Sequence, residues 1–451
     1  MAVKNNRMIK GAAVLGVGAF IAKLLGALYR VPLTNIIGGG GLGLYQMVFP
    51  VYALLLDFSG AGVPSALSKL ISGDRGGINS ARSYLINSIK IFLPFGVAFA
   101  LLMAIFARPI ASLQGAPDAY LAYITLAPAI IAVSAISCFR GYFQGLMSMS
   151  PTALSQIVEQ VIKLILGVLF AYLLRSNVVF AVAGATFAIT LSEFFALIYL
   201  AVRYLLHKKK FNLKVNFVRV QFSDCAKSII KTTIPVTLVG IMIPLSHVID
   251  SFVTVNVLNA YRVDATALFG LLSGVALTVV NLPVSICYGV STAAIPAVSA
   301  EKDDKKQDSA LKAVVMTAIL AFAAFIVTLI LAPFIVNLLF ANLSALEKQT
   351  AINLLRVVSP CILLLSLVQT TNAVLIGKDK LYSPIMSLGV GVIIKTILNL
   401  TLLRIPKLNI YGGGVSLIAC YFVVCLINLI LIFGLKVKNG NKSTYRREYA
   451  S

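Results

Sequence analysis

Charged residues are scarce in this sequence of 451 residues, at 12% of the total, and acidic residues are scarcer still, with 15 Asp and Glu against 38 Lys and Arg. Soluble domains carry about 25% charged residues. Hydrophobic residues make up 59% of the chain. The composition therefore excludes an ordinary cytosolic enzyme, a disordered protein and a disulfide scaffold, and it is typical of a polytopic membrane protein.

The motifs of several enzyme classes are also absent. The sequence holds no P-loop, no zincin motif and no nucleophile elbow. The basic stretch from Met1 to Lys10 precedes no cleavage site, so we expect no cleavable signal peptide. The six cysteines lack metal-ligand spacing and lie in or beside apolar runs, so we interpret them as small buried hydrophobes. We expect no enzyme, no metal site and no bound cofactor.

Twelve apolar runs are each long enough to cross a membrane once, since a crossing helix needs about 20 residues. They lie at 9–37, 43–71, 84–107, 119–147, 151–175, 178–206, 226–256, 265–298, 310–340, 350–376, 383–404 and 411–435. The sequence predicts an all-α polytopic membrane protein with about 12 transmembrane helices. We expect an N-terminal six-helix bundle at 1–206, a basic cytoplasmic linker at 207–225, a C-terminal six-helix bundle at 226–436 and a basic tail at 437–451.

Basic residues are distributed unevenly between the two sides of the membrane. If the N-terminus is cytoplasmic, the segments on its side hold 25 Lys and Arg, and the segments on the opposite side hold 6. Cytoplasmic loops are enriched in these residues. We therefore predict a protein of the cytoplasmic membrane with both termini inside the cell.

The two halves match each other at an offset of 232 residues. Tyr29-Arg30-Val31 corresponds to Tyr261-Arg262-Val263, and the same offset pairs Pro128 with Pro360, Gly145 with Gly377 and Lys163 with Lys395. Six crossings in each half make the repeats parallel. This pattern predicts two six-helix bundles around a central cavity, which suits alternating access.

Ionised side chains inside a membrane are costly and usually functional. The spans hold seven bases (Lys23, Arg30, Lys90, Arg140, Lys163, Arg356 and Lys395) and four acids (Asp57, Glu159, Glu193 and Asp250). A net basic interior attracts an anion, and the arginine fork suits phosphate. A carrier of organic cations would need the opposite balance.

Five of these bases are candidates for lining a substrate cavity: Lys23, Arg30, Arg140, Lys163 and Lys395. Two alternatives stay open. Glu159 precedes Lys163 by four residues, so the two can neutralise each other on one helix, and Arg30 can instead anchor the outer membrane interface.

The acids Asp57, Glu193 and Asp250 are candidates for ion coupling, with Na⁺, H⁺ or the membrane potential as the driving force. His247 precedes Asp250 by three residues, and for these two a local pair is the preferred interpretation.

Several segments together resemble a known family. They are Lys23 to Gly26, Tyr29 to Gly38, Gly43 to Gln46, Gly62 to Lys69 and, most specifically, RGYFQGLMSMSPTALSQIVEQ at 140–160. The chain resembles, over nearly its whole length, the stage V sporulation protein B group of polysaccharide-biosynthesis membrane proteins. That group belongs to the multidrug/oligosaccharidyl-lipid/polysaccharide flippase superfamily, which includes flippases of the MurJ type.

The resemblance implies a flippase that moves an undecaprenyl-pyrophosphate-linked sugar precursor outward, lipid II above all, for peptidoglycan or spore cortex. It implies that Lys23 and Arg30 on helix 1 line the cavity. The MurJ type has fourteen helices, two more than are found here, and basic residues in the stretch that carries Asp57. The expected partners are a polyprenyl-pyrophosphate-linked sugar lipid and membrane lipids, with no nucleic acid, and the expected state is a monomer.

Four other functions stay open. The first is a flippase for another lipid-linked polysaccharide unit, and the second is a multidrug or cation antiporter of the same fold, which would need an acidic cavity. The third is a membrane enzyme such as a glycosyltransferase, which would need carboxylates on a sizeable outer loop, where only Asp118, Asp264 and Glu347 occur. The fourth is a non-transporting sporulation membrane factor.

Overall fold

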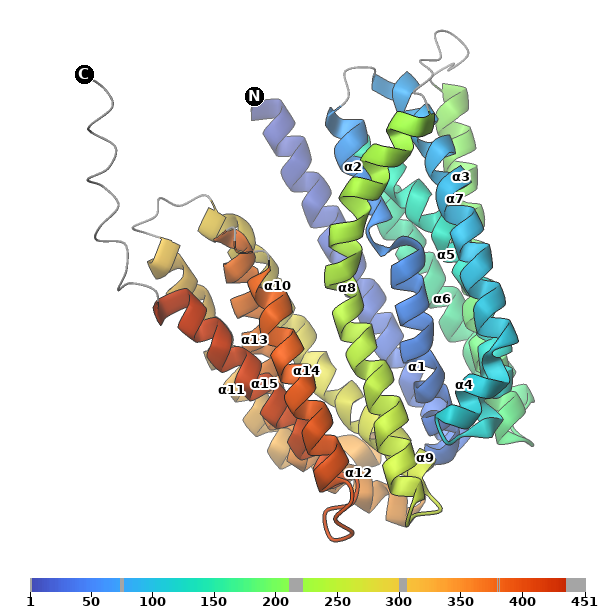
Figure 1. The fold of residues 1–451 in the computed structure, drawn as a ribbon, viewed down its shortest axis with the longest axis vertical. Helices are drawn as coiled ribbons and strands as arrows, with labels where there is room; N and C mark the ends of the chain where they lie inside the picture. Colours follow the sequence, from blue (N-terminus) through green and yellow to red (C-terminus); the bar gives the residue numbers. More distant parts are fainter. Residues whose placement is uncertain are drawn as a thin grey trace. The chain divides into compact units, whose positions relative to one another are not determined.

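The structure, a computed structural model, describes residues 2–73, 77–210, 222–299, 306–378, 380 and 382–434, and these ranges are helices joined by short turns (Figure 1). The tail at 437–451 and residues 211–221 of the basic linker lie outside the described residues. The first half contains α1 (Ala2–Leu56), η1 (Asp57–Ala61), α2 (Val63–Gly73), α3 (Gly77–Ile105), α4 (Ala107–Leu113), η2 (Pro117–Ala119), α5 (Tyr120–Gly145), α6 (Ser150–Leu173) and α7 (Val178–Lys210).

The second half contains α8 (Phe222–Asn259), α9 (Ala265–Gly270), η3 (Leu271–Ala276), α10 (Leu277–Ser299), α11 (Lys306–Leu339), α12 (Ala345–Val358), α13 (Pro360–Gly377), α14 (Ser383–Leu402) and α15 (Tyr411–Phe433). η1 and η3 are π-helical turns, and η2 is a 3₁₀ turn. The all-α architecture predicted from the sequence is confirmed.

The long element α1 consists of two helical arms that meet at a sharp bend. Gly38 has φ 67° and ψ −174°, a conformation outside the helical region that glycine adopts readily. The rings of Tyr29 and Tyr45, on either side of the bend, have centroids 6.4 Å apart. Sixteen residues of straight helix would separate them by about 24 Å. The chain therefore turns back at Gly38, and its arms run side by side (Figure 1).

The described residues contain eleven candidate membrane spans, judged by length and composition. The first runs for 60 residues from Val14 to Gly73 and includes both arms of α1. It therefore accounts for two crossings, and the eleven candidates supply the twelve crossings expected from the apolar runs. The chain is a multi-pass membrane protein.

Packing divides the chain into two compact units. The first comprises Met1–Thr278 with Val336–Ala351, and the second comprises Val279–Ile335 with Ile352–Ser451. Within the first unit, α8 packs against α1, α2, α3 and η1. The division at the 207–225 linker, proposed from the sequence, stays a prediction.

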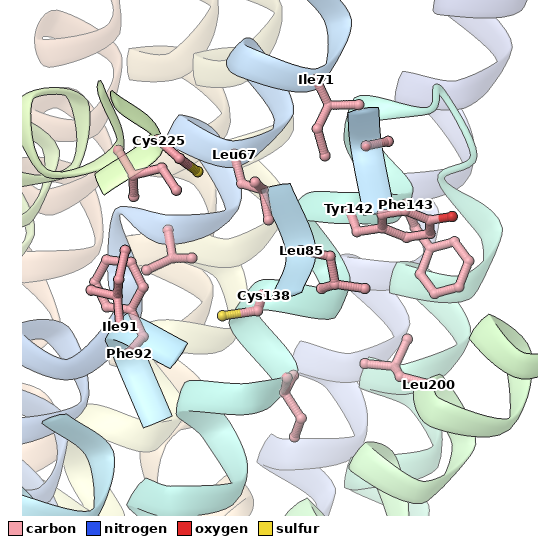
Figure 2. Packing of buried hydrophobic residues seen from close by; sticks show 14 of the residues in the cluster. Leu67, Ile71, Leu85, Ile91, Phe92, Cys138, Tyr142, Phe143, Leu200 and Cys225 are labelled. Carbon is pink, nitrogen blue, oxygen red and sulfur yellow. The ribbon is translucent and has the colours of Figure 1, made fainter. Parts of the chain in front are cut away.

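One hydrophobic cluster in the first unit is shared by five helices, as Figure 2 shows. Leu67 of α2, Leu85 of α3, Tyr142 of α5, Leu200 of α7 and Cys225 of α8 all belong to it. In the second unit, a smaller cluster joins residues of α10, α11, α13 and α15. All six cysteines are buried and free, which confirms their interpretation as small hydrophobes.

Hydrogen bonds hold residues 336–351 to the bend of α1. The Asn35 amide donates to the Leu339 carbonyl over 2.8 Å, and the backbone N–H of Gly39 donates to Glu347 Oε1 over 3.1 Å. The first N–H groups of a helix have no partner within that helix. Glu347 therefore caps the arm that starts after Gly38.

Helices α2 and α5 approach closely at Gly141. A Cβ built on Gly141 would lie 2.9 Å from Leu67 Cβ and 3.0 Å from Pro64 Cα, so Gly141→Ala requires the helices to shift. Overpacking of this kind costs about 1–3 kcal/mol. We expect a lower midpoint of thermal unfolding for the purified variant in detergent.

The matched control is Gly16→Ala, because a Cβ on Gly16 would meet no described residue within 4 Å and alanine is the better helix former. We expect the control to unfold at or above the wild-type temperature. Equal midpoints for the two variants would contradict the close packing of α2 on α5.

Candidate functional site

Basic side chains gather along one face of the first arm of α1. Lys23, Gly26 and Arg30 follow one another at helical spacing, and Lys23 and Arg30 are about 10 Å apart along the axis. Lys163 of α6 reaches this face at Gly26, where a Cβ would lie 3.9 Å from its Nζ atom. The same Nζ lies 5.6 Å from the centroid of the Tyr29 ring. Lys23 and Arg30 thus lie along this face and Lys163 lies beside it, and their joint role in a cavity stays a prediction.

Arg30 is half-buried and forms no ion pair within the described part of the chain. Its Nη1 donates to Thr278 Oγ1 over 2.7 Å. Its repeat counterpart Arg262 lies in the turn before α9 and donates two hydrogen bonds, of 2.8 and 2.7 Å, to the Asp264 carboxylate. That hydrogen-bonded guanidinium holds the pKa of Asp264 below its usual range. The two equivalent arginines thus differ in their partners. Arg262, in a turn, is paired with a carboxylate, whereas Arg30, in helix α1, is not.

The pair expected within α6 is replaced by a pair between helices. Glu159 Oε2 accepts from Arg140 Nη2 of α5 over 3.2 Å, and Arg140 Nε also donates to Ser155 Oγ over 3.1 Å. The Gln160 amide donates to Glu159 Oε1 over 2.7 Å. Glu159 pairs with Arg140 and not with Lys163. Lys163 therefore has no carboxylate at ion-pair distance among the described residues.

Glu193 of α7 completes the cluster and is buried, with 7% of its surface exposed. It lies within electrostatic range of Glu159, Arg140 and Lys163. Arg140 and Lys163 therefore lie near two carboxylates, Glu159 and Glu193, and Arg30 lies within electrostatic range of Lys163. We call these five side chains the intramembrane polar cluster, and its formal charge is positive.

Three polar groups beside this cluster were missed by the sequence analysis. Tyr52 Oη, Gln156 Oε1 and Gln160 Oε1 are buried without a hydrogen-bond partner among the described residues. Buried polar atoms are normally satisfied, so these atoms have capacity for a ligand or water. For the two glutamines the sequence did contain a signal. Gln156, Gln160 and Lys163 recur at the spacing of one helix face, so they lie on the same side of α6.

The other residues predicted for the site lie elsewhere. Lys395 belongs to the second unit, where it is buried on the face of α14 that carries Gly391 and Asn399. Asp250 of α8 has its carboxylate 3.9 Å from His247 Nδ1, which agrees with the local pair preferred from the sequence. Asp57 lies in the π-helical turn η1. The structure thus brings Glu193 to the basic cluster and leaves the other two candidate acids outside it.

A largely half-buried cluster with excess positive charge, held among membrane-spanning helices, is typical of a multi-pass membrane protein of the transporter type. The model of one protein family, described as polysaccharide biosynthesis protein, matches residues 8–300. The chain belongs to this family.

Comparisons with individual proteins agree with this assignment. The chain is 27% identical to stage V sporulation protein B of Bacillus subtilis (strain 168) in an alignment of 449 positions that covers 95% of this chain and 85% of that protein. It is 24% identical to the lipid II flippase MurJ of the same organism, with 95% and 83% covered.

Two solved structures share the fold. An inward-facing multidrug resistance transporter of the MATE family in the MOP superfamily matches with a TM-score of 0.76 at 15% identity, covering 91% of this chain and 93% of that chain. The lipid II flippase MurJ in an inward closed conformation matches with a TM-score of 0.73 at 15% identity, covering 93% and 87%. These similarities confirm the predicted fold class.

The assignment of Glu159 to Arg140 can be tested by double-mutant cycles on thermal unfolding. Residues in direct contact couple by about 0.5–3 kcal/mol. We expect coupling in this range between Arg140→Met and Glu159→Gln, and weaker coupling between Lys163→Met and Glu159→Gln. Stronger coupling of Glu159 to Lys163 than to Arg140 would show that the in-helix pair forms instead.

Proposed function

We propose that this protein is a flippase for an undecaprenyl-pyrophosphate-linked sugar precursor, moving it outward across the cytoplasmic membrane by alternating access. The observation that carries the proposal is the intramembrane polar cluster, in which Arg30 and Lys163 have no carboxylate partner among the described residues. Two membrane-embedded bases that form no ion pair are costly unless an anion joins them. A pyrophosphate supplies that charge.

The chemistry of the cluster matches the headgroup of such a lipid. Arginine presents a planar fork that binds phosphate oxygens through two parallel hydrogen bonds, and lysine adds a point charge. The unsatisfied oxygens of Tyr52, Gln156 and Gln160 suit the hydroxyl groups of a sugar. The polyprenyl tail stays in the bilayer, so the protein handles only the polar end.

The relatives support the proposal at the level of substrate class. The MurJ relative is by name a lipid II flippase, and the family description is polysaccharide biosynthesis. Lipid II is the substrate we propose first, and another lipid-linked polysaccharide unit is the alternative. We also propose that Lys23 and Lys395 contact the substrate during the cycle and that both termini are cytoplasmic. The function is transport without catalysis, performed by a monomer.

A multidrug or cation antiporter is the second candidate, because the MATE transporter shares the fold. A cation carrier needs an acidic binding site. The cluster instead holds three bases and two acids, and one of those acids is already paired with Arg140. The charge of the site therefore favours an anionic substrate.

The test is a lipid II accessibility assay in a host whose own flippase can be switched off. Expression of this chain is expected to restore outward exposure of lipid II. Arg30→Ala and Lys163→Ala are expected to reduce the restored exposure by about tenfold or more, since losing a charged hydrogen bond costs about 1.5–3 kcal/mol.

Lys90→Ala is the matched control, because Lys90 is also a membrane-span base but is exposed on α3. It is expected to retain wild-type activity. Full activity of both Arg30→Ala and Lys163→Ala at normal membrane levels would overturn the assignment of the cluster as the substrate site. No restoration by well-inserted wild-type protein would overturn lipid II as the substrate.

A further inference from the structure

The guanidinium group of Arg30 is held by a threonine that the sequence analysis did not single out. Arg30 Nη1 donates to Thr278 Oγ1 over 2.7 Å. Thr278 lies at the start of α10 and is buried, with 4% of its surface exposed. The Arg30 side chain forms no second hydrogen bond among the described residues. The position of the guanidinium therefore depends on the Thr278 hydroxyl.

The Thr278 hydroxyl is itself held in one orientation. Its Oγ1 donates to the Gly274 carbonyl oxygen, one helical turn earlier, over 2.6 Å. A hydroxyl has a single hydrogen to donate, so the lone pairs of this oxygen remain to accept from Arg30. The acceptor that receives the guanidinium N–H is thus oriented by the protein alone.

The segment that leads to Thr278 is packed tightly against the second arm of α1. A Cβ built on Gly274 in η3 would overlap the Leu42 side chain. The Gln46 amide donates to the Ser273 carbonyl oxygen over 2.8 Å. The threonine and the arginine that it holds are therefore both attached to α1, one through η3 and the other directly.

We propose that Thr278 is a positioning residue, which holds the Arg30 guanidinium in the orientation that binds the pyrophosphate of the substrate. This inference rests on the proposed function. An arginine side chain has several rotatable bonds, and ordering it before the ligand arrives strengthens binding. The guanidinium carries more N–H donors than the one that Thr278 accepts, so the bond to Thr278 persists while other donors bind phosphate oxygens.

The test measures how the purified full-length protein binds undecaprenyl pyrophosphate and uncharged undecaprenol, by native mass spectrometry. Thr278→Val removes the hydroxyl and nearly keeps the side-chain shape. It is expected to weaken binding of the pyrophosphate lipid by about threefold to tenfold, the usual cost of ordering one long side chain on binding, and to leave undecaprenol binding unchanged. Thr278→Ala is expected to give the same loss, whereas Thr278→Ser, which keeps the hydroxyl, is expected to bind as wild type.

The loss is expected to depend on Arg30, because Thr278 acts through the guanidinium. In an Arg30→Ala background, Thr278→Val is therefore expected to weaken binding no further. Ser273→Ala is the matched control. The Ser273 hydroxyl also donates to the carbonyl oxygen one turn earlier, that of Phe269, over 2.6 Å, but it accepts from no charged side chain among the described residues. Its affinity for the pyrophosphate lipid is expected to equal that of wild type.

Two results would overturn the role of Thr278 and leave the flippase assignment intact, when wild-type protein prefers the pyrophosphate lipid. One is wild-type affinity in both Thr278→Val and Thr278→Ala, and the other is an equal loss from Thr278→Val with and without Arg30. Equal binding of the two lipids by wild-type protein would instead overturn the proposed function, and this inference with it.

Discussion

The constraint on which this structure depends is the cost of positive charge inside a membrane. A lysine or arginine at the centre of a span costs about 2.5–3.5 kcal/mol on insertion scales. Arg140 offsets this cost by pairing with Glu159. Arg30 and Lys163 do not pair with a carboxylate in the described part of the chain, and we propose that an anionic ligand compensates them.

The fold holds Arg30 and Lys163 near one another. The bend at Gly38 returns the chain so that Tyr45 lies against Tyr29, and Tyr29 in turn lies beneath the Lys163 ammonium group. Gly26 leaves room beside α1 for Gln160 of the same helix as Lys163, because a Cβ at Gly26 would lie 3.0 Å from Gln160 Oε1. The positions of Arg30 and Lys163 therefore follow from the packing of α6 on a bent α1.

Sequence reasoning was strongest where the signal was a composition or a period. Apolar runs predicted the crossings, because a membrane span is long and uniform, and the charge balance indicated a net basic interior. Sequence reasoning was weaker at predicting which side chains pair with one another. Helical spacing put Glu159 next to Lys163, but the ion pair joins Glu159 to Arg140, 19 residues away, through the packing of α5 on α6. The repeat offset also makes Arg30 and Arg262 equivalent, although their surroundings differ. Arg30 lies within α1, whereas Arg262 pairs with Asp264 in a turn. Such contacts depend on tertiary geometry that no local pattern contains.

The central claim is that the intramembrane polar cluster recognises the charge of a lipid pyrophosphate. Native mass spectrometry of the purified protein with undecaprenyl pyrophosphate and with uncharged undecaprenol, at equal concentrations, tests this claim most directly. The account predicts that the pyrophosphate lipid binds at least about tenfold more tightly, because one charge-assisted hydrogen bond alone contributes about 1.5–3 kcal/mol. Equal binding of the two lipids would contradict it.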